Sequence, residues 1–441
     1  MPLSTFAAVT LDHEARALLT RLAIVKPFAQ IIPAVAAAHI SPAATTSIEE
    51  YLVSGRKELR RLVTGYLQWI RRAGRRVEPS EAQRRLAIIR LKFNAVLTQF
   101  DIFADALVQR CEHEYGVWLA GLDLVADDAL NLPGGYFTHP PIVVYLDRGH
   151  GAAIRRARTR LPGGGENPVA IIRIPRERMV GSGIASSLMH EVGHQGAALL
   201  GLIGSMQSTL LDEQKKSSAR HRLAWYLWHR WISEILADFW AVAKVGVAAT
   251  QGLIGVVSLP RAFVFRVNID DPHPVPWIRV KLSIAMGKVL YPHPQWEKLS
   301  QIWEAFYPKA SLEPKKLHII RILEETMPRF TRLLVNHQPE SLAGKSLREV
   351  FSLEERMPDR LSDLYERWRV SPFEMQNTSP VLVFAVLGQA KQDGKLQPAE
   401  ESRIIRKKLN QWALGRAMRP LSSQKERRPR RPPVRIMTAA T

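Results

Sequence analysis

The sequence predicts an α+β fold that is mostly helical, with a small sheet in its central part. Two observations favour this fold class. Long stretches toward both ends of the chain place apolar residues at helical spacing, whereas the middle contains short β-branched runs. At 441 residues, the chain is expected to form two or three domains rather than one. We expect helical residues 1–132, a mixed core at 133–298, a second helical region at 299–415 and a basic tail at 416–441.

The first region is predicted to be helical and strongly basic. Residues 81–107 and 108–129 form periodic runs, and the sequence Pro-Gly-Gly at 133–135 ends the pattern. Residues 56–92 contain twelve Lys or Arg and three acidic residues. Apolar side chains are interleaved with these charges, which indicates amphipathic helices with the charges on their solvent-facing side.

Two short strands are predicted in the central region. Residues 141–146 and 169–174 are apolar and rich in Val and Ile. The glycine-rich segment 162–165 lies between them, and a flexible connection is favoured over a phosphate site because no helix follows it directly. After the second strand, Gly181, Ser182 and Gly183 predict a turn and a capping serine for the next helix.

That helix carries the residues that say most about chemistry. His190, Glu191 and His194 form the motif HExxH. Because residues four apart lie on the same face of a helix, both imidazoles can reach one tetrahedral Zn²⁺. Glu191, between them, can then face a water that occupies the remaining coordination position.

A second helix, predicted around residues 231–240, contributes two carboxylates. Glu234 and Asp238 are four residues apart and share one helix face. They lie among the apolar residues Trp231, Ile235 and Phe239, so at least one of them is expected to be buried. A buried carboxylate requires a metal, a cation or hydrogen-bond donors.

HExxH followed some forty residues later by ExxAD resembles the gluzincin, thermolysin-like branch of zinc metallopeptidases, over about residues 140–280. The resemblance implies a zincin-like catalytic core that hydrolyses peptide bonds in a peptide or protein substrate. It implies that His190, His194 and Glu234 bind Zn²⁺, that Glu191 is the general base, and that Asp238 orients His190. In zincins a strand ahead of the active helix is the edge along which substrate lies, and residues 169–174 are our candidate for it.

A donor for the developing oxyanion is not fixed by the sequence. His273 follows the ExxAD helix in a loop that prolines rigidify, which favours a side chain facing the pocket. The alternative is a turn histidine bonded to Asp271. Tyr226 and His229, about two turns and one turn before Glu234, are further candidates that can instead pack with neighbouring tryptophans.

Other metal sites fit the sequence less well. A di-iron bundle needs two Glu-x-x-His motifs, and the pair Glu191 and His194 is the one present. A structural zinc site would favour cysteines, of which Cys111 is the single example, and the third histidine of the metzincin motif is absent. Two hypotheses without catalysis stay open. His190 and His194 could only form hydrogen bonds in a core, or the chain could have a zincin fold that binds no metal.

The net charge of +21 predicts attraction to polyanions. From Arg416 onward the chain has eight basic residues and one acid, Glu426, among several prolines, and this tail is expected to be disordered. The alternative function is therefore that of a non-catalytic basic interaction protein that binds nucleic acid or an acidic partner. One cysteine, no secretion signal and no membrane-spanning segment predict a cytoplasmic protein.

Overall fold

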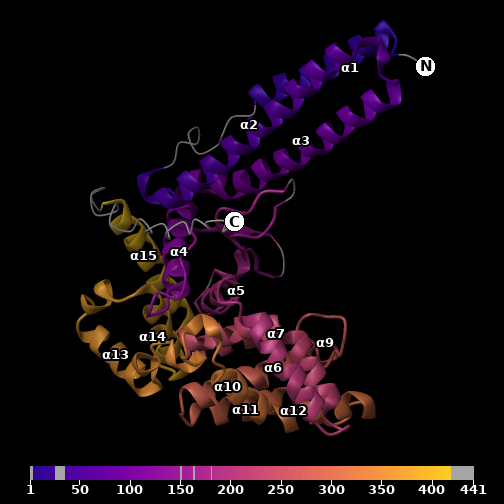
Figure 1. Ribbon diagram of the computed structural model, residues 1–441. Coiled ribbons are helices and arrows are strands. Elements are labelled where there is room, and N and C mark those ends of the chain that lie inside the picture. Colours follow the sequence, from indigo (N-terminus) through magenta and orange to yellow (C-terminus); the bar gives the residue numbers. More distant parts are fainter. Residues whose placement is uncertain (1–2, 25–34, 149–150, 162–163, 180, 419–441) are drawn as a thin grey trace, which may run out of the picture.

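The computed structural model describes residues 3–24, 35–148, 151–161, 164–179 and 181–418. Most of these residues are helical, and three short strands form one sheet, so the predicted fold class is confirmed. The chain forms a long three-helix arm and a larger helical body, with the sheet between them (Figure 1). The basic tail that was predicted to be disordered falls almost entirely outside the described residues.

The helices and strands alternate with short connections and several single 3₁₀ turns. Their bounds in chain order are α1 Thr5–Ile24, α2 Pro42–Ala73, α3 Pro79–Val108, α4 His113–Leu130, β1 Ile142–Asp147, β2 Ala153–Arg155, β3 Ala170–Pro175, α5 Ser182–Leu199, α6 Leu202–Lys216, α7 Arg222–Val245, α8 Val247–Val257, α9 Arg261–Val264, α10 Pro276–Leu290, α11 Gln295–Phe306, α12 Pro314–Val335, α13 Pro358–Val370, α14 Pro380–Gln392 and α15 Pro398–Ala417.

The arm consists of α1, α2 and α3, which pack lengthwise and project from the body (Figure 1). Proline at the start of α2 and again of α3 fits the first helical turn, where its missing N–H costs nothing. The Ser41 side chain also accepts a hydrogen bond from the N–H of Ala44 and so caps α2. The three helices bury a hydrophobic core of their own, which continues onto one face of the sheet.

The sheet separates this arm core from the core of the body. Its strand order is β1-β3-β2, with β1 and β3 parallel and β2 antiparallel to β3. Alternate residues of β1 and β3 point to opposite sides: Val143 and Ile171 belong to the arm core, whereas Val144 and Ile172 belong to the body core. The body core also contains α4, which packs against β1, α5 and α15.

The prediction that residues 169–174 form the free edge of the sheet is wrong. These residues lie in and beside β3, which is the central strand because it pairs with both β1 and β2. The two edge strands are β1 and β2, and β2 is a strand of three residues that was not predicted. Its sequence, Ala-Ile-Arg, is too short to show a strand period.

The start of α5 also differs from the prediction. Ser182 is the first residue of the helix rather than its capping residue, and the N-cap position belongs to Gly181, which has a φ of 42°. A Cβ at Gly181 would lie 2.1 Å from a carboxylate oxygen of Glu401, so the site requires glycine. The Ser182 hydroxyl instead accepts a hydrogen bond of 2.8 Å from the Lys391 amine.

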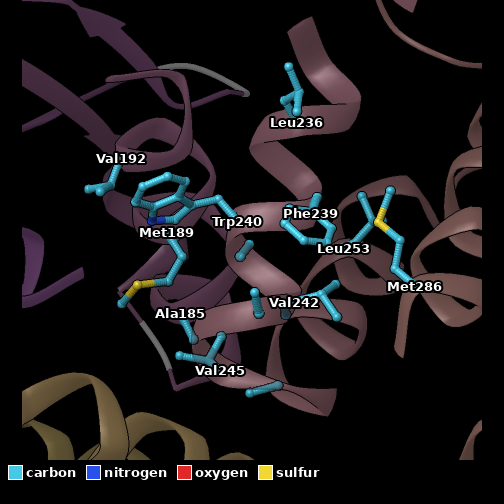
Figure 2. Close-up of a cluster of buried hydrophobic side chains, with 14 of the residues drawn as sticks. Ala185, Met189, Val192, Leu236, Phe239, Trp240, Val242, Val245, Leu253 and Met286 are labelled. Carbon is cyan, nitrogen blue, oxygen red and sulfur yellow. The ribbon is translucent and has the colours of Figure 1, made fainter. Parts of the chain in front are cut away.

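Close packing of α5 against α7 sets the geometry of the body. Two glycines of α5 make this approach possible, because a Cβ at Gly193 would lie 2.8 Å from Cα of Ala237, and one at Gly196 would lie 2.4 Å from the ring of Trp240. The Trp240 side chain of α7 lies beside Met189 and Val192 of α5, and all three are buried (Figure 2). The two helices that carry the predicted site are thus held in direct backbone contact.

No helix among the described residues is long and apolar enough to cross a membrane.

Lys244 is buried in the body, and its titration should change the free energy of unfolding. Burial lowers the pKa of Lys244 from 10.5 to about 7, and its amine donates a hydrogen bond to the carbonyl of Asn131. Between about pH 7 and 10 the unfolded chain therefore holds more protons than the folded one, and the free energy of unfolding rises with pH across this window.

Replacing Lys244 by Met should remove that part of the pH dependence. We expect the rise between pH 7 and pH 9 to be smaller in Lys244→Met by on the order of 1–2 kcal/mol. Urea unfolding of both proteins at the two pH values measures the difference. Identical pH dependence would show that Lys244 titrates normally in the folded protein.

Candidate functional site

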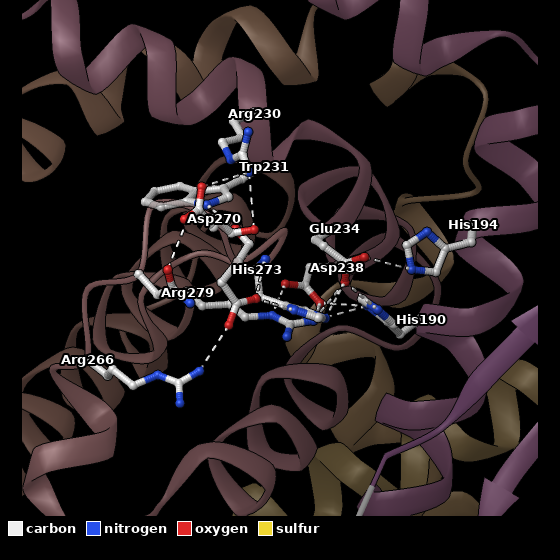
Figure 3. Close-up of polar contacts among 12 residues, drawn as sticks. His190, His194, Arg230, Trp231, Glu234, Asp238, Arg266, Asp270, His273 and Arg279 are labelled. Atoms are coloured by element: carbon white, nitrogen blue, oxygen red, sulfur yellow. Dashed lines mark hydrogen bonds and ion pairs between the residues drawn. The ribbon is translucent and has the colours of Figure 1, made fainter.

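The candidate site lies between α5 and α7, where the HExxH and ExxAD segments meet (Figure 3). His190 and His194 are one turn apart on α5, and their rings are nearly perpendicular with centroids 4.7 Å apart. Glu234 reaches them from α7: its carboxylate lies 3.2 Å from Nε2 of His190 and 3.4 Å from Nε2 of His194. The two motifs that are forty residues apart in sequence are therefore adjacent in space.

These three side chains form a group that could hold a metal ion. One donor atom from each lies within 4.8 Å of the other two, and no other such group of His, Cys, Asp or Glu occurs among the described residues. Each of the three side chains is less than 15% exposed. Such a donor set, two imidazoles and a carboxylate, is typical of a metal site with an open coordination position.

The polar contacts of Glu234 also fit a metal site. Its Oε2 atom is buried and has no well-aligned hydrogen bond, although ring nitrogens of His190 and His273 each lie 3.2 Å away. Burial alone would raise the pKa of Glu234, but the neighbouring imidazoles hold it well below its usual range. A buried carboxylate that stays ionised beside two imidazoles is compatible with a cation site.

Asp238 lies one turn beyond Glu234 and contacts the first histidine. Its Oδ1 atom is 2.8 Å from Nδ1 of His190, so the other ring nitrogen, Nε2, is directed toward Glu234 and His194. Burial lowers the pKa of His190, but the hydrogen bond to Asp238 and the contact with the Glu234 carboxylate outweigh this effect and raise the pKa to about 9. For His194, burial and the nearby His190 lower the pKa to about 4.

The sequence did not point to Arg279, which completes this arrangement from α10. Its guanidinium donates to both oxygens of Asp238, at 2.6 and 2.8 Å, and its side chain is 13% exposed. Asp238 therefore contacts a buried arginine and His190 at once, and these contacts lower the pKa of its carboxyl well below the usual range although burial acts in the opposite direction. A basic residue between the apolar residues Ile278 and Val280 was the available signal.

His273 lies at the mouth of the site, in the loop before α10. Its Nδ1 atom is 2.8 Å from Oδ1 of Asp271, and its Nε2 atom is 3.2 Å from Oε2 of Glu234. The ring is thus bonded to Asp271, as one interpretation expected, and also lies against Glu234, while its role as a donor to an oxyanion stays a prediction. The contact with Glu234 raises the pKa of His273, although its partial burial acts in the opposite direction.

The other two candidate donors lie elsewhere on α7. Tyr226 is 39% exposed, and neither it nor His229 makes a hydrogen bond or ion pair with any site residue that the structure describes. Both precede Glu234, and both therefore lie on turns of α7 before the one that faces His190.

Glu191 is buried beside the histidines, with only 5% of the residue exposed. Burial raises the pKa of its carboxyl to about 7, and the charges of His190, Glu234, Arg279 and His273 all act on it. A carboxyl whose pKa lies near neutral pH can both accept and release a proton under ordinary conditions. Perturbed pKa values of this kind cluster at functional sites.

Asp238→Asn is expected to weaken metal binding about 10–100-fold, because it removes the carboxylate that orients His190 and leaves Arg279 without its charge partner. Competition with a metal-sensitive dye measures the affinity. Asp363→Asn, an exposed substitution on α13, serves as the control and should leave the affinity unchanged. Equal affinities for Asp238→Asn and the unmodified protein would exclude this role.

No family model, no curated protein and no solved structure matches this chain.

Proposed function

We propose that the protein is a zinc-dependent peptidase. The observation that carries this proposal is the meeting of His190, His194 and Glu234 around one point, with Glu191 buried beside them. The HExxH and ExxAD segments resemble those of gluzincin metallopeptidases, and every residue that the resemblance implies lies in this one cluster. Zinc is the metal we propose because two imidazole nitrogens and one carboxylate oxygen are its usual ligands in hydrolytic sites.

When bound, Zn²⁺ would act as a Lewis acid and lower the pKa of water in the site toward about 7. Glu191 takes a proton from the attacking water and delivers it to the leaving amine. Its pKa of about 7 suits both steps, because the carboxyl is neither strongly acidic nor permanently protonated.

The surrounding residues support this proton transfer. His273 can donate a hydrogen bond to the oxyanion that forms on the carbonyl when its ring is protonated, because Nδ1–H then donates to Asp271 while Nε2–H points into the site, and the contact with Glu234 raises the pKa of His273 and favours this form. Asp238 and Arg279 hold His190 in one orientation. These contacts exist before any ligand arrives, so little reorganisation accompanies the reaction.

The test is peptide cleavage by the zinc-loaded full-length protein. A library of peptides from a digested proteome is incubated with the protein and with a sample held in excess chelator, and new termini are identified by mass spectrometry. We expect cleavage products that require zinc and are lost on chelation. A library left intact by the zinc-loaded protein would contradict the proposed function.

A further inference from the structure

Four arginines follow one another along the free edge of the sheet. Arg155 ends β2, Arg156 and Arg158 lie in the turn that follows it, and Arg160 forms an isolated antiparallel bridge with Glu166. Arg155, Arg158 and Arg160 are exposed, and Arg156 is half-buried. No acidic residue interrupts them within 153–161.

These charges are not neutralised by the protein. None of the four guanidiniums forms an ion pair with a carboxylate that the structure describes, and the guanidinium of Arg158 donates a hydrogen bond to the main-chain carbonyl of Thr138. By contrast, Arg173 on the neighbouring strand pairs with Asp147. The edge of the sheet therefore keeps a concentrated positive charge for something outside the chain.

This edge can pair with another strand. β2 forms its ladder with β3 on one side, and its other side has no partner among the described strands. The carbonyls of Arg155 and Arg156 already accept hydrogen bonds from Nδ2 of Asn167, so a peptide would pair with the other main-chain groups of this edge. Such pairing with an edge strand is a common mode of peptide recognition.

The edge is also attached to the helix that carries the site. The N–H of Ala157 donates a 2.8 Å hydrogen bond to Oε1 of Gln195, which directly follows His194 on α5. Ile154 packs into the body core, and β2 contacts α5. A peptide bound along β2 therefore lies close to the site.

We infer that β2 and the turn after it, residues 153–160, bind acidic peptide segments, so that the preferred substrates carry several Asp or Glu residues near the cleaved bond. The substrate preference rests on the proposed function, whereas the binding of acidic peptides does not. Main-chain pairing along β2 would align the peptide, and its carboxylates would contact the four guanidiniums. Each exposed pair contributes up to about five-fold in affinity, and several together give a clear preference.

The experiment measures binding separately from cleavage. Two fluorescein-labelled peptides, identical except that one has Glu and the other Gln at alternate positions, are titrated with zinc-loaded Glu191→Gln protein. Fluorescence anisotropy then reports the affinity of each. We expect the Glu peptide to bind about ten-fold more tightly than the Gln peptide, with a difference that shrinks as salt is added.

A charge-reversed variant locates the binding surface. Arg155→Glu/Arg156→Glu, in the Glu191→Gln background, should lose the preference for the Glu peptide. The control, Lys298→Glu/Lys315→Glu, changes the net charge equally at exposed lysines of α11 and α12 and should keep the preference. Circular dichroism of both variants confirms that they fold.

The outcomes separate this inference from the proposed function. Equal binding of the two peptides, or a preference that survives in Arg155→Glu/Arg156→Glu, would overturn the inference. Cleavage of library peptides by the unmodified protein is scored independently. Selective binding of the Glu peptide without any cleavage would support the inference and contradict the proposed peptidase function. Cleavage without a preference for the Glu peptide would support the peptidase function and contradict the inference.

Discussion

Glu191→Gln is expected to lower the rate of peptide hydrolysis by about 10²–10⁴-fold while the metal content stays unchanged. Gln has nearly the shape of Glu but cannot accept and release the proton that hydrolysis requires. Glu191 is not among the residues whose donor atoms converge on the metal position, so its loss leaves the ligands in place. Cleavage rates on a library-derived substrate, together with metal analysis of the same samples, measure both effects.

The electrostatics of the site indicate that this variant will fold. Burial already raises the pKa of Glu191 to about 7, so the protein tolerates a neutral side chain at this position near neutral pH. Glu340→Gln, an exposed substitution of the same chemical kind, is the control and should keep full activity. Hydrolysis that persists in Glu191→Gln at the unmodified rate would exclude Glu191 as the general base.

Gly193→Ala is expected to destabilise the protein by about 1–3 kcal/mol and to weaken metal binding at the same time. The added Cβ would lie 2.8 Å from Cα of Ala237 and 2.9 Å from its carbonyl oxygen, so backbone rather than a flexible side chain must move. Moving α7 away from α5 also moves Glu234 and Asp238 away from the histidines. Thermal unfolding and dye competition measure the two effects.

Gly204→Ala is the matched control for this substitution. Gly204 lies within α6, and a Cβ at that position would meet no atom within 4 Å. Ala is favoured over Gly in a helix by up to about 1 kcal/mol, so Gly204→Ala should be neutral or slightly stabilising. If Gly193→Ala were as stable as Gly204→Ala and bound metal normally, close packing of α5 against α7 would not determine the geometry of the site.

The sequence predicted the helical character and the cluster of site residues because both depend on local spacing. His190 and His194 share a helix face at any position in any fold, and the same holds for Glu234 and Asp238. Their apolar neighbours indicated burial, and the resemblance to gluzincins implied that the two helices meet at one site. The structure places these four residues in contact.

Features that depend on tertiary packing could not be predicted in the same way. Arg279 lies 41 residues beyond Asp238, on a helix whose sequence contains no motif that would pair the two residues. β2 is a strand because β3 offers it a partner, and three residues carry no periodic signal of their own. Ser182 looked like a capping residue, but its hydroxyl contacts Lys391, more than two hundred residues away in sequence.

The most direct test of the account is the metal content of the purified full-length protein and of Glu234→Ala, measured by mass spectrometry after reconstitution with zinc. We predict about one zinc per chain in the unmodified protein and a marked loss in Glu234→Ala, because two histidines alone hold zinc weakly. No zinc in the unmodified protein, or equal zinc in both, would contradict the three-residue site.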